Sequence, residues 1–151
     1  MYNFIATGQP PTFNSWKHKW DAVKKASYKT AIAGTIFGYH PATTPLQDDL
    51  YGVIYHFFNK DLKIDADNLS KPMWDTLNSI FYADDYQIKM RIAGSFDLKK
   101  NGLTVLDFTS LGGQLAVDIL DAFDNEDHII YVECGKMNFN QWKFNLEANG
   151  N

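Results

Sequence analysis

The segment 63–85, which reads KIDADNLSKPMWDTLNSIFYADD, constrains the fold of this chain more than any other. Its apolar residues recur at the spacing of a helix, so we expect an amphipathic helix from about Asp67 to Ile80. Extended residues precede that helix and would project Asp65 and Asp67 from one face of a strand end. Around the helix the segment gathers five aspartates and a central lysine, namely Asp65, Asp67, Asp75, Asp84, Asp85 and Lys71.

Carboxylates crowded around one element repel each other, and a hard divalent cation is the usual remedy. The segment holds no histidine or cysteine, so its oxygen ligands favour Mg²⁺ or Mn²⁺ over zinc. In two-metal hydrolysis, such ions activate the attacking water and stabilise the leaving oxygen. Lys71, one helical turn after Asp67, is placed to neutralise charge on a reacting phosphate. The pattern therefore predicts a metal-dependent reaction at a phosphate.

Two other interpretations fit parts of this segment. Its DADN resembles the opening of a calcium-binding EF-hand loop, but Ser70 and Thr76 stand where that loop needs glycine and glutamate. In a purely structural interpretation, Asp67 caps the helix and Asp75 pairs with Lys71 one turn earlier. That interpretation leaves the other three aspartates unexplained.

The rest of the chain alternates strands and helices, with no repeat or linker that would divide it. We expect one α+β domain, with a mixed β-sheet of about four to five strands packed by two to three helices. Within a central strand, His56 is expected to pack in the core. The other expected elements are strands at Tyr2–Thr7, Asp49–Asn59, Gln87–Leu98, Leu103–Phe108 and His128–Lys136, and helices from Asn14 or Ser15 to about Ala33 and over Gly112–Phe123.

The first of these helices has two different faces. Trp16, Trp20 and Val23 cluster within about 60° of arc and would face the core. Lysines lie on the opposite side, with Tyr28 near them. One interpretation is a solvated lysine face, and the other is a strip that contacts DNA phosphates, with Tyr28 available to stack on a base. The candidate DNA-binding residues here are Asn14, Lys17, Lys25 and Lys29.

Charge is distributed unevenly along the chain, whose net charge is −4. Residues 1–40 carry five lysines and one aspartate, whereas residues 101–151 carry two lysines and eight acidic groups. The N-terminal part suits a polyanion, and the C-terminal part would repel one. A single cysteine, Cys134, excludes an internal disulfide. With no signal peptide and no apolar stretch long enough for a membrane, we expect a soluble, cytoplasmic protein.

The acidic segment resembles the core motif of the RusA-type Holliday-junction resolvases. That motif reads D-x-D-N-L-x-K-x-x-x-D-x-L and, after a gap, D-D; its positions are matched here by Asp65, Asp67, Asn68, Leu69, Lys71, Asp75, Leu77, Asp84 and Asp85. The N-terminus is similar as well, with a short strand, two prolines and a small residue before the asparagine and aromatic residue that open a helix: Pro10, Pro11, Thr12, Asn14 and Trp16. The resemblance covers residues 1–97.

The resemblance implies a homodimeric, Mg²⁺-dependent endonuclease that cuts paired strands of a branched DNA, the four-way junction, with Mn²⁺ able to replace Mg²⁺. A symmetric junction needs one cut on each of two strands, and two sites related by C2 symmetry supply them. In the roles that the resemblance implies, the catalytic carboxylates and metal ligands are Asp65, Asp67 and Asp85, the catalytic lysine is Lys71, and the supporting residues are Asp75 and Asp84.

Two features depart from the family pattern. Family members run from the turn after the third strand almost directly into a closing strand, whereas here about 25 residues, roughly 102–126, come between. We therefore expect one RusA-like domain over residues 1–151 with an insertion at about 102–126. The chain is also acidic, and fewer phosphate contacts weaken DNA binding. The alternative function is a non-catalytic or weakened RusA-like module for DNA or protein binding, with a protein partner for the acidic C-terminal part.

Overall fold

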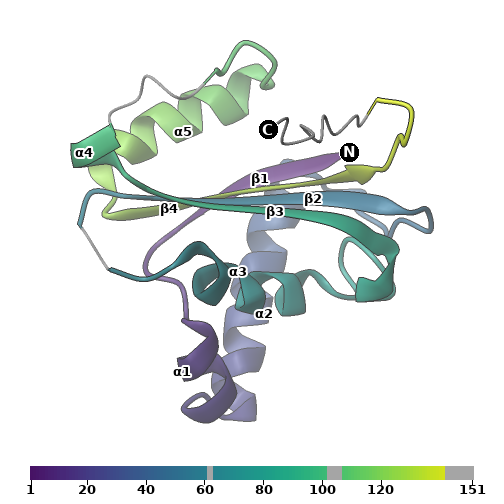
Figure 1. The fold of residues 1–151 in the computed structure, drawn as a ribbon, viewed down its shortest axis with the longest axis horizontal. Coiled ribbons are helices and arrows are strands. Elements are labelled where there is room, and N and C mark those ends of the chain that lie inside the picture. Colours follow the sequence, from purple (N-terminus) through teal and green to yellow (C-terminus); the bar gives the residue numbers. More distant parts are fainter. Residues whose placement is uncertain (61–62, 102–106, 142–151) are drawn as a thin grey trace, which may run out of the picture.

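One mixed β-sheet organises this chain, of which the computed structural model describes residues 1–60, 63–101 and 107–141. Its strands are β1 (Tyr2–Thr7), β2 (Leu50–Phe58), β3 (Ile88–Asp97) and β4 (His128–Lys136), in the spatial order β1–β4–β2–β3. β4 runs antiparallel to both of its neighbours, and β2 runs parallel to β3. The sheet and its helices form a single α+β domain, which confirms the predicted fold class (Figure 1).

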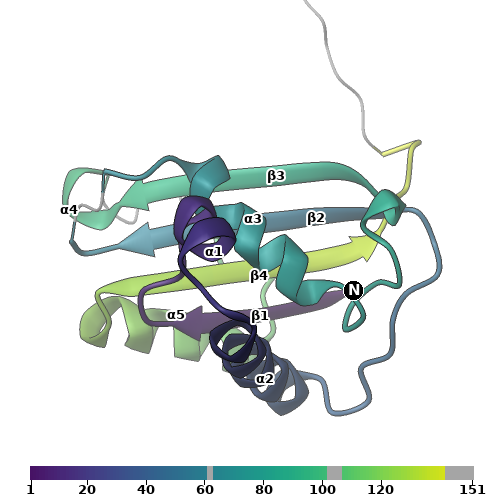
Figure 2. The same ribbon diagram turned by 90° about the horizontal axis from the view of Figure 1, so that it is seen from below.

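Helices cover both faces of the sheet (Figures 1 and 2). On one face lie α1 (Phe13–His18), α2 (Ala22–Tyr39) and α3 (Ala66–Leu77), and on the other lies α5 (Gly113–Asn125). Two short helices follow α3 in the chain, the 3-10 helix η1 (Asp85–Gln87) and α4 (Leu98–Asn101). The described helices outnumber the two or three expected, because one expected helix is broken in two and α4 spans only one turn.

The prediction of one continuous helix over residues 14–33 is wrong. Two helices, α1 and α2, stand there, and the second ends later than expected. The side chain of Thr12 caps α1, and that of Asp21 caps α2 by accepting a hydrogen bond from a first-turn amide at 2.8 Å. The Asp21 side chain bonds to the backbone amide of the next turn, which favours an extended Asp21 and the start of a new helix after it over continuation of α1. α2 then continues to Tyr39, past the expected end at about Ala33. The exposed Gly34 does not stop it, since a glycine inside a helix costs only about 1 kcal/mol.

The break also changes which side chains of α1 and α2 face the core. Trp16 is buried as predicted, whereas Val23 is 75% exposed, contrary to the prediction. Tyr28 is not available to stack on DNA either, because its ring packs edge-on against Trp16 and Trp20 at centroid distances of 5.8 and 5.7 Å. Burial raises the pKa of Tyr28 above its usual value, so its hydroxyl stays protonated. These rings join α1 to α2.

α3 packs against the sheet through the apolar face that the sequence predicts. Leu69, Met73 and Leu77 are each no more than 1% exposed, and burying a side chain of this size contributes about 1.5–3 kcal/mol. Trp74 adds a contact by lying over Gly52 of β2, where a Cβ atom would stand 2.5 Å from the tryptophan ring. These contacts fix α3 along the sheet, from the end where β2 finishes to the end where β3 begins (Figure 2).

The second face of the sheet packs against α5. Leu115, Ile119 and Phe123 of this helix join Phe57 of β2 in a second buried cluster. This confirms the helix expected in this part of the sequence. β4 follows α5 directly and occupies the interior of the sheet between β1 and β2. α5 and β4 therefore share the sheet and its core with the elements that precede them.

Other predictions from the sequence have mixed outcomes. β1 and β4 have the predicted bounds, and β2 and β3 differ from them by one residue at each end. The strand predicted over Leu103–Phe108 falls largely on residues 102–106, which lie outside the described residues. In the described ranges, no helix is long and apolar enough to cross a membrane.

Candidate active site and nucleic-acid interface

The N-terminal end of α3 carries two of the predicted site carboxylates. Asp65 is the N-cap of the helix, and its Oδ1 accepts a hydrogen bond from the Asn68 amide at 2.7 Å. Asp67 follows in the first turn with its side chain exposed. The prediction that both project from an extended strand end is wrong, because the helix begins at Ala66. Both carboxylates instead stand at the positive end of the helix dipole, which favours negative charge there.

Lys71 and Asp75 follow Asp67 at successive turns of α3. The Nζ of Lys71 lies 2.7 Å from the Oδ1 of Asp75, and the two side chains are 36% and 34% exposed. An ion pair this open to water stabilises a fold by only about 0–1 kcal/mol. The ion pair also holds the Lys71 side chain on the face of α3 that carries Asp67, Lys71 and Asp75 at successive turns. The predicted catalytic lysine is thus positioned by one of the predicted supporting aspartates.

Asp84 and Asp85 stand at the other end of α3. The Asp84 side chain accepts a hydrogen bond from the Tyr86 amide at 2.9 Å, and Gln87 Oε1 accepts one from the Asp84 amide at 3.0 Å. This capping box holds Asp85 exposed in η1, with its Oδ2 3.3 Å from Nη2 of Arg91. Asp84 therefore supports the position of Asp85, and Arg91 is a neighbouring cation that the sequence motif does not mark.

The structure keeps the two ends of the acidic segment apart. α3 has 12 residues, which gives a length of about 18 Å. The ligands of Mg²⁺ lie only about 2.1 Å from the ion, so Asp85 cannot share one ion with Asp65 and Asp67 of the same chain. Accordingly, no three His, Cys, Asp or Glu side chains among the described residues lie close enough to hold a metal ion. The metal-ligand set stays a prediction.

Asp65 and Asp67 nevertheless have the chemistry that Mg²⁺ requires. Mg²⁺ in nucleotide and nucleic-acid enzymes usually takes one or two carboxylates and fills its other positions with water and phosphate oxygens. Asp65 uses Oδ1 to cap α3, which leaves its other oxygen for a ligand role, and Asp67 is exposed. Two hard carboxylates at a helix N-terminus, where phosphate also binds well, are therefore a fit for this ion.

A basic helix lies beside this end of α3. The backbone amide of Asn14 in α1 donates to Oδ1 of Asn68 in α3 at 3.4 Å. Asn68 thereby ties α1 to the turn that holds Asp65 and Asp67. Lys17 of α1 is exposed. Two predicted DNA-binding residues, Asn14 and Lys17, thus stand on the helix nearest to the carboxylates.

Two lysines of α2 stand on tryptophan rings, one in α1 and one in the link between α1 and α2. Lys25 Nζ lies 5.5 Å from the ring centroid of Trp16, and Lys24 Nζ lies 4.5 Å from that of Trp20. Such contacts hold long side chains in place by about 0.5–1 kcal/mol each at exposed sites. Lys29 is exposed one turn further along α2. Sequence reasoning missed Lys24, because the predicted continuous helix gave it a different direction.

The sheet separates the basic part of the chain from its acidic part. Residues 13–39, which include α1 and α2, contain five lysines and one aspartate, whereas residues 107–127, which include α5, contain six acidic and no basic residues. These two groups cover opposite faces of the sheet (Figure 1). Salt screens charges over about 8 Å, less than the thickness of a helix of about 10 Å. The acidic residues around α5 therefore contribute little to the charge that a ligand meets near Asp65.

Carboxylates and a lysine on one helix, beside a basic and aromatic helical surface, have the chemistry that suits the phosphodiester backbone of nucleic acid. Residues 3–106 match the family model described as Endodeoxyribonuclease RusA. The chain belongs to this RusA endodeoxyribonuclease family, the RusA-type Holliday-junction resolvases, as the sequence motif predicts. A search of curated proteins found no match. The matched part holds every predicted site residue and ends before α5 and β4.

Proposed function

We propose that this chain is a structure-selective endonuclease that cuts four-way DNA junctions at the N-terminal end of α3. The observation that carries the proposal is the contact between α1 and α3, in which the Asn14 amide bonds to Oδ1 of Asn68. This contact brings α1, which carries Lys17, against the turn of α3 that holds Asp65 and Asp67. A DNA backbone that follows the lysines would therefore pass the two carboxylates. Membership of a family that acts on branched DNA supports the choice of substrate.

The proposed reaction is hydrolysis of a phosphodiester that leaves a 5′-phosphate and a 3′-hydroxyl. Asp65 and Asp67 would hold Mg²⁺, or Mn²⁺ in its place, which supplies activation of the attacking water and stabilisation of the leaving oxygen. Lys71 brings a positive charge to the phosphate, and Asp75 holds it in place from 2.7 Å. The amides at the start of α3 add partial positive charge to the same place.

The proposal includes a homodimer, because one chain keeps Asp85 about 18 Å of helix away from Asp65 and Asp67. In a C2 dimer with two antiparallel α3 helices side by side, the start of one α3 lies near the end of the other. Asp85 of the partner subunit would then complete the ligand set of each site. Two such sites per dimer also match the two cuts that a symmetric junction needs.

Mixing two inactive variants tests this shared site. Asp67→Asn and Asp85→Asn chains are denatured together and refolded, so that mixed dimers form. With shared sites, both substitutions fall in the same site of a mixed dimer and the other site is intact, so that nicking of one strand returns. If the mixture stays as inactive as each variant alone, the site lies within one chain or the chain is not an enzyme.

A cleavage assay on three DNA substrates tests the function as a whole. A synthetic four-way junction, a flap and a linear duplex are incubated with Mg²⁺ or Mn²⁺, with Asp67→Asn and Lys71→Ala as controls. We expect cutting of the junction alone, and its loss in both controls. No cutting of any branched substrate would reject the enzyme and favour the non-catalytic binding module. Equal cutting of the duplex would keep the chemistry but reject the selectivity for junctions.

A further inference from the structure

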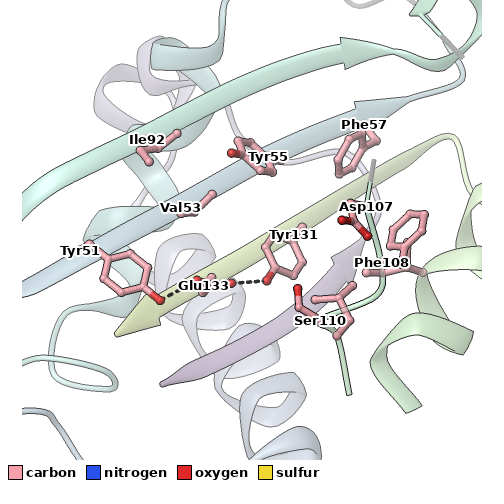
Figure 3. A pocket seen from close by; sticks show the side chains of 12 residues that line it. Tyr51, Val53, Tyr55, Phe57, Ile92, Asp107, Phe108, Ser110, Tyr131 and Glu133 are labelled. Atoms are coloured by element: carbon pink, nitrogen blue, oxygen red, sulfur yellow. Dashed lines mark hydrogen bonds between the residues drawn. The ribbon is translucent and has the colours of Figure 1, made fainter. Parts of the chain in front are cut away.

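A cavity of about 350 Å³ opens on the sheet face that carries α5, opposite to the proposed active site (Figure 3). Its floor consists of aromatic and aliphatic side chains of β2, β3 and β4. Its wall is formed by Asp107, Phe108, Ser110 and Leu111 and by Ile119 of α5. α5 contacts the sheet mainly over β1 and β4, which leaves room over β2 and β3. A cavity of this size accommodates a small ligand or a side chain from a partner.

Glu133 of β4 gives the floor of this cavity its charge. Its Oε1 accepts a hydrogen bond from the Tyr51 hydroxyl at 2.7 Å, and its Oε2 accepts one from the Tyr131 hydroxyl at 2.5 Å (Figure 3). Burial and the Glu133 carboxylate raise the pKa of both tyrosines, so their hydroxyls keep their protons and continue to donate. A carboxylate has about four acceptor positions, so Glu133 can still accept hydrogen bonds from a ligand.

Aromatic rings and a second carboxylate stand around Glu133. The ring of Tyr55 stacks against that of Tyr131, with centroids 6.3 Å apart and an interplanar angle of 24°. Such rings present negative faces that attract cations. Asp107 lines the cavity from the segment before α5, and hydrogen bonds from the Thr109 hydroxyl and amide lower the pKa of its carboxyl. The cavity thus combines two anionic groups with aromatic walls.

This lining selects a flat organic cation. No basic side chain is among the described residues that line the cavity, so a phosphate or a nucleic acid would meet two carboxylates without a counter-charge. An uncharged ligand would bury Glu133 away from water without an ion partner, which is unfavourable. A guanidinium group suits both features, because its plane stacks on aromatic rings and its N–H fork matches a carboxylate.

We propose that the cavity binds an arginine side chain of a basic protein partner. A protein chain is favoured as the source because α5, which lines the cavity through Ile119, also carries exposed acidic and apolar groups. On α5, Val117 is 61% and Leu120 is 48% exposed, and residues 107–127 carry six acidic and no basic residues. A basic segment of a partner covers these apolar side chains and places its arginine beside Glu133. This gives the partner expected for the acidic C-terminal part a defined chemistry, independently of the nuclease function.

An NMR titration of the full ¹⁵N-labelled chain tests this proposal. One probe is a short peptide with a single arginine between lysines and glycines, and the other is the same peptide with uncharged citrulline in place of arginine. We expect the arginine peptide to shift amide resonances around Tyr55 and Glu133, and to bind at least about tenfold more tightly than the citrulline peptide. Equal binding of the two peptides, or shifts centred on Asp65 and Asp67, would overturn the proposal.

Substitutions in the cavity separate its charge from its shape. Glu133→Gln keeps an acceptor for the tyrosine hydroxyls, and we expect it to raise the Kd of the arginine peptide about tenfold. Asp107→Asn, on the exposed rim, should raise this Kd about two- to fivefold, and it keeps the test valid if Glu133→Gln fails to fold. Asp124→Asn, an exposed acidic position of α5 outside the cavity, is the matched control and should change it less. Native Kd values for the arginine peptide in both cavity variants would refute the site. Binding of the free amino-acid derivative arginine amide as tightly as the peptide would refute a protein segment as its ligand.

Discussion

The Nδ1 atom of His56 on β2 lies 3.0 Å from the Nε2 atom of His128 on β4, and neither ring is more than 3% exposed. One nitrogen must donate the hydrogen and the other accept it, which two neutral rings in matched tautomers satisfy. Burial lowers the pKa of His56 to about 3, with a further contribution from His128, and burial lowers the pKa of His128 to about 4. The expectation that His56 packs in the core is confirmed.

This buried pair predicts that acid destabilises the fold well above the pH at which carboxylates titrate. In the unfolded chain both histidines take up protons near pH 6.5, whereas in the folded chain they do not until about pH 4 or 3. Stability is therefore fully present above pH 6.5 and falls as the pH drops toward the folded-state pKa values. We expect a loss of about 2 kcal/mol per histidine between pH 7.5 and 5, measured by urea unfolding at both pH values.

Matched variants assign this pH dependence. The double variant His56→Leu/His128→Leu should lose most of the difference between the two pH values, whatever its stability at pH 7.5. His18→Gln, which changes an exposed histidine of α1, should retain it. Equal stability of the native chain at pH 7.5 and 5 would contradict the assignment of two neutral buried rings.

Asp65 has two roles that a pair of substitutions can separate, because it caps α3 and is a proposed metal ligand. Asparagine caps a helix about as well as aspartate, whereas alanine costs about 1 kcal/mol. We expect Asp65→Asn to keep the native free energy of unfolding and lose junction cleavage. Asp65→Ala should lose both. Urea unfolding and the cleavage assay measure the two effects, and native cleavage by Asp65→Asn would exclude its carboxylate from the reaction.

The ion pair between Lys71 and Asp75 predicts a change in rate with little change in stability. Asp75→Asn leaves the ammonium group without its partner at 2.7 Å, and the free energy of unfolding should fall by no more than about 1 kcal/mol. Misplacement of the lysine should slow cleavage about 10- to 100-fold, with junction affinity unchanged. Single-turnover cleavage and anisotropy binding measure these quantities. A loss of stability with a native cleavage rate would make the pair purely structural.

Parts of the fold that depend on local pattern could be predicted from the sequence. β1 and β4 have their predicted bounds, because runs of apolar residues between turn-forming residues mark a strand whatever its partners are. The buried face of α3 and the pair of Lys71 with Asp75 follow from helical spacing in the same way. The sequence motif also identified the family, since it fixes residue types at defined separations.

Parts that depend on long-range geometry could not be predicted. A motif gives the order of Asp65 and Asp85 along the chain, but not that a packed helix separates them by its whole length. The break at Asp21 was hidden because a capping aspartate inside an amphipathic pattern looks like a polar helix position. Glu133 meets the Tyr51 hydroxyl across 82 positions of sequence, and only the pairing of β2 with β4 brings them together.

Gly52 predicts a sharp steric limit beneath α3. A Cβ atom there would lie 2.5 Å from the buried ring of Trp74, so Gly52→Ala should push the ring away and reduce the free energy of unfolding by about 1–3 kcal/mol. Gly34→Ala is the matched control, because nothing lies within 4 Å of its added Cβ. In the middle of α2 it should stabilise by about 0.5–1 kcal/mol. Equal unfolding midpoints for the two variants would show that Trp74 yields without cost.

The basic face of α2 predicts a change in the salt dependence of DNA binding. If Lys25 and Lys29 each contact a phosphate, the double variant Lys25→Gln/Lys29→Gln should bind a four-way junction more weakly, and its slope of log K against log salt should become shallower by about 1.8. Fluorescence anisotropy with a labelled junction and no divalent metal measures this slope without cleavage. The control Lys99→Gln/Lys136→Gln removes the same charge from α4 and the end of β4, away from α1 and α2. Because counterion release counts phosphate contacts and not net charge, the control should keep the native slope. If both double variants change the slope equally, the lysines of α2 act only through the net charge and their face is a solvated one.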